Sequence, residues 1–239
     1  MRNLSIIIEY DGTRFFGWQY QPNKRTVQGE IQTALKKVIG GDVKLTGAGR
    51  TDHGVHALGQ VANFHTASQL PLLSIKKGIN SLTGDDVYIR DIGVVADDFN
   101  SRFSAKSKVY DYRIALEPSP FRLRYSWYVK QVPDIALMQR AIPSLIGQRD
   151  FAGFAVQNGS ENTVCNVHEI SVNRESNQIY IRVRGDRFLR KMVRGLVGFM
   201  VDIGRGRFSL ADVSGFFDGS RTGINFAPPQ GLFLVSIEY

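Results

Sequence analysis

The chain lacks the features on which several classes of protein depend. Cys165 is the only cysteine among 239 residues, which excludes an internal disulfide and a cysteine-based metal cluster. No hydrophobic run approaches the roughly 18 apolar residues of a membrane-spanning helix. The apolar start of the chain is short and is soon followed by Glu9 and Asp11, so we expect no secretory signal. These absences predict a soluble, cytoplasmic protein without a membrane partner.

The glycine-rich segment 47–57, GAGRTDHGVHA, matches neither common phosphate-binding fingerprint. A dinucleotide-binding fingerprint would need glycine where Asp52 stands, and a P-loop would need Gly-Lys followed by Ser or Thr. His53 and His56 could form half of a metal site, but the other two histidines, His65 and His168, stand at no recognisable ligand spacing. We therefore expect no cofactor and no metal, and we expect both loop histidines to fix the loop through hydrogen bonds.

Positive charge is in excess. The chain has 30 Lys and Arg against 22 Asp and Glu, a net charge of +8. Such an excess favours a polyanionic partner, usually a nucleic acid, because binding releases counterions. Evenly scattered lysines would give the same net charge, so the positions of the arginines must decide whether the chain binds a nucleic acid.

Strand and helix patterns alternate along the chain and predict an α+β fold with antiparallel sheets. One helix is expected between the N-cap Thr26 and Gly40, where the helical spacing of apolar residues stops. Further helices are predicted at residues 72–80, 134–146, 186–203 and 209–217. Strands are predicted at residues 4–10, 43–46, 60–65, 87–95, 109–116, 167–173, 179–184 and 232–238.

The segment 47–57 is the most unusual part of the sequence. Three glycines in eight residues allow positive φ angles and close approach of the backbone to a ligand. The turn that they bracket presents Arg50, Thr51 and Asp52 side by side. For an isolated aspartate, a structural ion pair or a turn cap is the usual role, so this pattern alone does not establish catalysis.

Residues 49–57, G-R-T-D-x-G-V-H-A, resemble the signature of the tRNA pseudouridine synthase A (TruA-type) family. Four more segments are similar to that family in the expected order and span nearly the whole chain. They are EYDGTRFFGWQYQ (9–21), DDFNSRFSAKSKVYDYRI (97–114), FLRKMVRGLVG (188–198) and APPQGLFLVSIEY (227–239).

The resemblance implies a pseudouridine synthase fold, in which two α/β lobes surround a central antiparallel sheet with a basic cleft. The lobes would be residues 1–104, with the catalytic loop, and residues 105–239, together one catalytic unit. The implied activity is that of an isomerase, an intramolecular transferase that converts uridine to pseudouridine at positions 38, 39 and 40 of the tRNA anticodon stem and loop. It also implies a homodimer in which one tRNA contacts both subunits.

The resemblance also assigns roles by position. Asp52 stands where the family has its catalytic aspartate, and Tyr110 where it has a tyrosine against the target base. Arg194 stands where a basic residue pairs with that aspartate, and Arg50 matches a loop arginine implicated in displacing the target nucleotide. His53 departs from the pattern, since a small residue is more usual there.

The segment VYDYRI at 109–114 alternates like a strand, so Tyr110 and Tyr112 face the same side. The strand pattern alone cannot choose between them, and a core aromatic is the ordinary role for either. Only the family resemblance selects Tyr110 as the side chain that would stack on uracil.

A basic stripe is predicted on the helix at 186–203. At 100° per residue four cations share one face without an acid: Arg187, Arg190, Lys191 and Arg194. A solvated basic face is the simpler interpretation. We favour a face toward RNA phosphates for the first three, with Arg194 reaching Asp52.

Three other functions remain open from the residues alone. The chain could be a non-catalytic basic RNA-binding module, a structural RNA chaperone, or a metal-dependent hydrolase using Asp52, His53 and His56. Pseudouridine formation needs no redox partner or group carrier, so the lack of cofactor motifs agrees with the isomerase. An ionised carboxylate could attack C1′ of the ribose or abstract a ribose proton, and the sequence does not distinguish the two.

Overall fold

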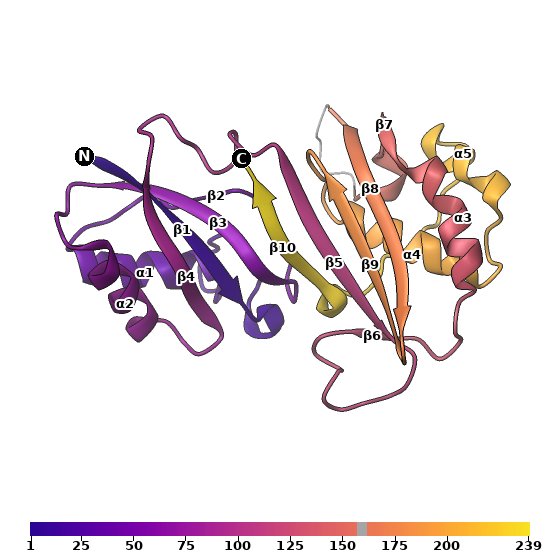
Figure 1. The fold of residues 1–239 in the computed structure, drawn as a ribbon, viewed down its shortest axis with the longest axis horizontal. Coiled ribbons are helices and arrows are strands. Elements are labelled where there is room, and N and C mark those ends of the chain that lie inside the picture. The colour runs from indigo at the N-terminus through magenta and orange to yellow at the C-terminus, as the bar shows by residue number, and fades with distance from the viewer. Residues whose placement is uncertain (157–161) are drawn as a thin grey trace. The chain divides into compact units, whose positions relative to one another are not determined.

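The computed structural model describes residues 1–156 and 162–239 (Figure 1). They form two compact units, one of residues 1–106 with 233–239 and one of residues 107–232. Each unit combines a β-sheet with helices, which is the predicted α+β class. The lobe boundaries suggested by the sequence, 1–104 and 105–239, remain a prediction. None of the described helices is long and apolar enough to cross a membrane.

The first unit contains a mixed sheet. Its strand order is β4 (Val87–Val95), β1 (Arg2–Tyr10), β3 (His56–Thr66) and β10 (Leu232–Glu238), and the short β2 (Thr46–Gly47) pairs with β3. β1 is antiparallel to both of its neighbours, whereas β10 runs parallel to β3. The predicted strands at 87–95 and 232–238 are confirmed in full, and the antiparallel expectation holds for all but the β3–β10 pair of this sheet.

Two helices belong to the first unit. In α1 (Val27–Ile39) the Thr26 hydroxyl accepts the Gly29 N–H at 3.3 Å, and Gly40, at φ 75°, ends the helix in the left-handed conformation. These are the predicted caps, and they satisfy backbone groups that a helix end leaves without partners. α2 (Leu72–Leu82) confirms the second predicted helix and packs against both α1 and β4.

The predicted strand at 43–46 is wrong except at its last residue. Two side chains of α1 take the backbone carbonyls that a strand would offer to a neighbour. Gln32 Nε2 donates to the Val43 carbonyl at 2.9 Å, and Gln28 Nε2 donates to the Leu45 carbonyl at 2.8 Å. Only Thr46 and Gly47 pair with β3.

The second unit has a sheet in the order β5 (Ser107–Ala115), β9 (Gln178–Gly185), β8 (Val164–Glu175) and β7 (Gly147–Asp150), and β6 (Trp127–Tyr128) runs parallel to β5. Its helices are α3 (Ile135–Leu145), α4 (Met192–Gly204) and α5 (Val213–Phe217). Single 3-10 turns lie at Gly12–Arg14 in the first unit, and at Ala152–Phe154, Leu210–Asp212 and Pro229–Gly231 in the second. β6 and β7 were not predicted from the sequence, because they are short and lack an alternating apolar pattern.

α4 forms the centre of the second unit's core. All of its residues except Arg194 are buried. Phe199 packs edge-on against Phe154, with ring centroids 5.3 Å apart, and against Phe216 at 4.9 Å. A Cβ on Gly195 would lie 2.1 Å from the Phe154 carbonyl oxygen, so only glycine lets this backbone lie directly on the helix.

The helix predicted at 186–203 begins six residues late, at Met192. The Asp186 carboxylate accepts the Asn166 N–H at 2.9 Å, and the Arg190 carbonyl accepts the Val156 N–H at 3.0 Å. Lys191 has φ 61° and ψ 6°, a left-handed conformation that ends any helical path arriving from before it. Tertiary hydrogen bonds therefore override the apolar periodicity, and the predicted basic stripe on one helix is wrong.

Candidate active site

Asp52 lies in the loop between β2 and β3, and hydrogen bonds fix the backbone on either side of it. The Thr51 carbonyl accepts the Trp18 N–H at 3.0 Å, and the Asp52 carbonyl accepts the Val55 N–H at 3.2 Å. Gln60, a buried polar residue on β3, donates from Nε2 to the Gly49 carbonyl at 2.9 Å.

A buried hydroxyl pair sets the direction of the loop. The Tyr10 hydroxyl and Thr51 Oγ1 lie 2.7 Å apart, and both side chains are buried. Burial raises the pKa of the Tyr10 phenol above its ordinary value, so this group stays protonated and uncharged. With Thr51 held inward, its neighbours Arg50 and Asp52 lie toward the surface, Arg50 exposed and Asp52 partly exposed.

Two glycines let the segment after β1 lie directly on this loop. Gly17 has φ +88°, and a Cβ there would lie 2.6 Å from the Thr51 carbonyl oxygen. A Cβ on Gly12 would lie 2.0 Å from the Val55 carbonyl oxygen. Real Cβ atoms do not come this close to backbone, so residues 12–18 hold the loop only while both positions are glycine.

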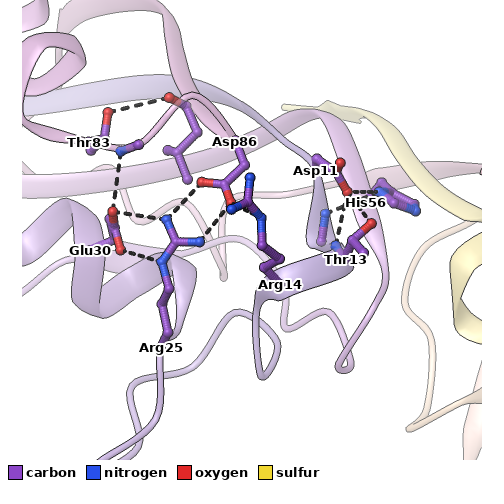
Figure 2. Close-up of polar contacts among 11 residues, drawn as sticks. Asp11, Thr13, Arg14, Arg25, Glu30, His56, Thr83 and Asp86 are labelled. Atoms are coloured by element: carbon purple, nitrogen blue, oxygen red, sulfur yellow. Dashed lines mark hydrogen bonds and ion pairs between the residues drawn. The ribbon is translucent and has the colours of Figure 1, made fainter. Parts of the chain in front are cut away.

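His56 fixes the end of the loop, as expected (Figure 2). Its buried Nδ1 accepts the Gly12 N–H at 3.1 Å and also lies 3.1 Å from Asp11 Oδ1. A backbone N–H can only donate, so Nδ1 is the acceptor in the contact with Gly12. The same carboxylate oxygen accepts the Thr13 N–H at 2.9 Å.

His53 does not follow the same expectation. It is exposed, and its ring lies against Phe16, with centroids 5.0 Å apart and planes tilted by 44°. The ammonium of Lys24 lies 4.4 Å from the centroid of the same Phe16 ring.

Arg25 anchors the segment before α1 (Figure 2). Its guanidinium donates to both oxygens of Glu30, at 3.0 and 3.1 Å, and to both oxygens of Asp86, at 2.6 and 2.8 Å. Hydrogen bonds from Arg25 hold the pKa of the Asp86 carboxyl below its usual range. The Arg25 carbonyl accepts the Phe16 N–H at 2.9 Å, so this network also fixes Phe16.

The second unit holds the two tyrosines between which the strand pattern could not choose. Tyr112 is fully buried and donates its hydroxyl to the Pro228 carbonyl at 2.7 Å; burial raises the pKa of this phenol, and Arg194 opposes the rise. Tyr110 retains 7% of its surface and meets Phe188 edge-on, with centroids 5.3 Å apart. Both tyrosines are therefore buried, and only Tyr110 keeps a small exposed fraction.

Arg194 stands in the first turn of α4. Its Nε donates to the Ala227 carbonyl at 2.7 Å, and its own carbonyl accepts the Ala227 N–H at 3.0 Å. A Cβ on Gly198 would lie 1.7 Å from the Asn225 carbonyl oxygen, so this glycine allows residues 225–227 to reach the helix. The guanidinium direction is thus set by a backbone segment far away in sequence.

The other predicted basic residues lie before α4 and not on it. Arg187 is partly buried and donates from Nη2 to the Asn162 carbonyl at 3.3 Å. Arg190 is exposed, and the Lys191 ammonium lies 5.9 Å from the Phe226 ring centroid. Arg187 also lines a polar pocket of about 450 Å³ with the buried Cys165, whose thiol pKa is raised to about 11 by burial.

No metal site is apparent in the described parts of the chain. Within residues 1–156 and 162–239, no three side chains of His, Cys, Asp or Glu are grouped so that they could hold an ion. Of the predicted site residues, Asp52 and Arg50 belong to the first unit and Tyr110, Arg187, Arg190, Lys191 and Arg194 to the second.

Comparison with known proteins identifies the family. The family model described as tRNA pseudouridine synthase matches residues 6–104 and 141–239. The chain is 42% identical to the tRNA pseudouridine synthase A of Geotalea uraniireducens over 245 residues, covering 100% of both chains. It is 40% identical to the proteins of the same name from Syntrophotalea carbinolica, covering 100% of this chain and 97% of that one, and from Caldicellulosiruptor saccharolyticus, covering 100% of both. The chain therefore belongs to the tRNA pseudouridine synthase family.

Proposed function

We propose that this chain is an isomerase that converts uridine to pseudouridine at positions 38, 39 and 40 of the tRNA anticodon stem and loop. The observation that carries this proposal is the fixed loop that presents Asp52, in a chain that matches its relatives from end to end. The relatives are named tRNA pseudouridine synthase A, and a net charge of +8 suits an RNA substrate.

Asp52 is proposed as the catalytic residue. The reaction breaks the N1–C1′ bond, rotates the uracil and joins C5 to C1′; the C5 hydrogen leaves as a proton and N1 gains one. The carboxylate either attacks C1′ or removes a ribose proton. Either role needs a carboxylate held in a fixed position. The hydrogen bonds of Thr51, Gly49 and Val55 fix the backbone of the loop that carries it.

Three more residues have proposed roles toward the substrate. Tyr110 would stack on the uracil; it keeps 7% of its surface exposed, whereas Tyr112 is fully buried and its hydroxyl is bound to the Pro228 carbonyl. Arg194, directed by Ala227, would supply the positive charge that stabilises the carboxylate. Arg50, exposed beside Asp52, would occupy the space that the target nucleotide leaves. Phosphate contacts are proposed for Arg187, Arg190 and Lys191.

The proposed setting is the cytoplasm, where tRNA is modified, and the proposed assembly is a homodimer with the tRNA anticodon arm as partner. The support for both is the family resemblance. Light scattering of the purified protein should give the mass of two chains, and with tRNA the mass of two chains plus the bound tRNA. A monomer in both samples would contradict the dimer but leave the activity untouched.

The test of function is incubation with unmodified tRNA that has uridine at positions 38, 39 and 40, followed by chemical mapping of pseudouridine. Product is expected at those positions, with or without EDTA, because the proposed chemistry is carried out by the Asp52 carboxylate and uses no metal-activated water. Binding without product would favour the RNA-binding module. Activity that EDTA abolishes and zinc restores would favour the hydrolase.

A further inference from the structure

An exposed cluster of ring and cationic side chains lies beside the Asp52 loop. Phe16 keeps 43% of its surface, although it contacts both the His53 ring and the Lys24 ammonium. His53 and Lys24 are themselves exposed. His53 directly follows Asp52, so the cluster begins one residue from the proposed catalytic carboxylate.

The backbone beneath this cluster is fixed. The Phe16 N–H donates to the Arg25 carbonyl at 2.9 Å, and the Phe16 carbonyl accepts from Gln21 Nε2 at 3.0 Å. A Cβ on Gly17 would lie 3.3 Å from the His53 nitrogen, so the two segments touch. A fixed backbone beneath an exposed ring pair reduces the ordering cost of binding a flat partner on it.

The chemistry of the cluster suits a nucleotide. Proteins bind unstacked bases on aromatic and histidine rings and bind the adjoining phosphates with basic side chains. Here two rings and one ammonium lie together, and the exposed Arg50 stands on the same loop. A uridine that leaves its stack to reach Asp52 exposes the face of the base next to it.

We propose that Phe16, His53 and Lys24 form a nucleotide platform for the RNA residue adjacent to the target uridine. The His53 ring takes the base of that residue, Phe16 supports the His53 ring, and Lys24 binds the adjoining phosphate. His53 is thus a positioning residue for the reaction. The platform rests on the proposed function, because it presumes a uridine at Asp52.

The test uses tRNA with 2-aminopurine placed, in turn, on each side of the target uridine, since stacking quenches the fluorescence of this base. The wild-type protein should quench it at one of the two positions. His53→Ala should restore the fluorescence there and weaken binding by about 5- to 150-fold, the range for losing one base stack. His53→Phe keeps a ring and should keep the quenching. Lys24→Ala should lower the log–log salt slope of binding by about 0.7.

His65→Ala is the matched control, because His65 is an exposed histidine of the same unit that contacts the Asp97 carbonyl at 3.2 Å. It should match the wild type in fluorescence and affinity. Thermal melting of each variant checks that it is folded. If wild-type protein forms pseudouridine and His53→Ala quenches and binds as the wild type does, the platform is refuted. If wild-type protein forms none from the parent tRNA, the proposed function itself fails.

Discussion

Replacing Arg25 by methionine should destabilise the first unit more than any single surface ion pair would. The substitution keeps much of the side-chain length but removes all the hydrogen bonds to Glu30 and Asp86 (Figure 2). Two carboxylates then remain close together, and the Asp86 side chain is only 8% exposed. Its remaining contact with Arg14 is longer, at 3.5 Å.

The size of the loss follows from burial. Removing one partner of a fully buried ion pair costs about 3–5 kcal/mol, whereas an exposed pair is worth about 0–1 kcal/mol. The Arg25 side chain is 35% exposed, so it lies between these limits, and we expect a loss of about 2–4 kcal/mol. For a chain of this size that corresponds to a fall in melting temperature of roughly 5–15 °C.

The loss should also depend on pH. The Asp86 pKa is lowered in the folded protein, with the Arg25 hydrogen bond as the largest cause. Its contribution to stability is therefore full above the unfolded carboxyl pKa of about 3.9 and disappears as pH falls through the lower folded value. The difference between wild type and Arg25→Met should be constant from about pH 6 to 8 and shrink below about pH 4.

Urea unfolding followed by circular dichroism at pH 7 and at pH 3.5 measures both effects. Arg14→Met is the control, because Arg14 contacts the same carboxylate but its side chain is 75% exposed. It should cost less than about 1 kcal/mol. The reasoning is refuted if the two variants lose equal stability at pH 7, or if the Arg25→Met difference grows in acid.

Three further perturbations test separate parts of the account. Gly17→Ala puts an alanine at a positive φ and places its Cβ against the Thr51 carbonyl, so both turnover and stability should fall. Gly40 has a similar φ but nothing within 4 Å of its Cβ position, so Gly40→Ala should lower the free energy of unfolding by about 1–2 kcal/mol and leave turnover unchanged. Equal turnover in the two variants would contradict this prediction. Cys165 is buried with a pKa of about 11, so a thiol reagent at pH 8 should not label the native protein or slow the enzyme, and stoichiometric labelling before unfolding would show that it is accessible. The proposed phosphate contacts are Arg187, Arg190 and Lys191, and changing each to alanine should lower the log–log salt slope of tRNA binding by about 0.7–0.9. An unchanged slope in the triple alanine variant would show that these residues do not contact phosphate.

Local signals were sufficient where a segment's own residues decide its structure. Thr26 and Gly40 delimited α1 because capping depends on neighbouring backbone groups alone. The strands at 87–95 and 232–238 were found because each apolar run follows turn residues, at 84–86 and at 228–231.

Local signals failed where distant partners take the backbone hydrogen bonds. Residues 186–191 have helical periodicity, but Asn166 and Val156 bind their polar groups and Lys191 turns the chain. Segment 43–46 gives its carbonyls to side chains of α1 instead of to a strand.

The candidate site also has a part that the local sequence predicts and a part that depends on distant residues. Asp52 stands out in the sequence because glycines bracket it. The residues that fix its loop do not, since Tyr10, Gln60 and Gly17 reach it from other elements. Gln60 is one of several buried polar residues of β3, so its position in the sequence did not single it out. The link from Arg25 to Asp86 spans 61 residues, and spacing alone could not suggest it.

The central claim is that Asp52 performs the isomerisation, and tritium release tests it most directly. Unmodified tRNA carrying tritium at uracil C5 must lose that label when C5 is joined to C1′. Wild-type protein should release it in step with pseudouridine formation. Asp52→Asn, which keeps the shape and removes the carboxylate, should bind the tRNA equally well and release tritium only at the background rate. Release by Asp52→Asn at close to the wild-type rate would contradict the account.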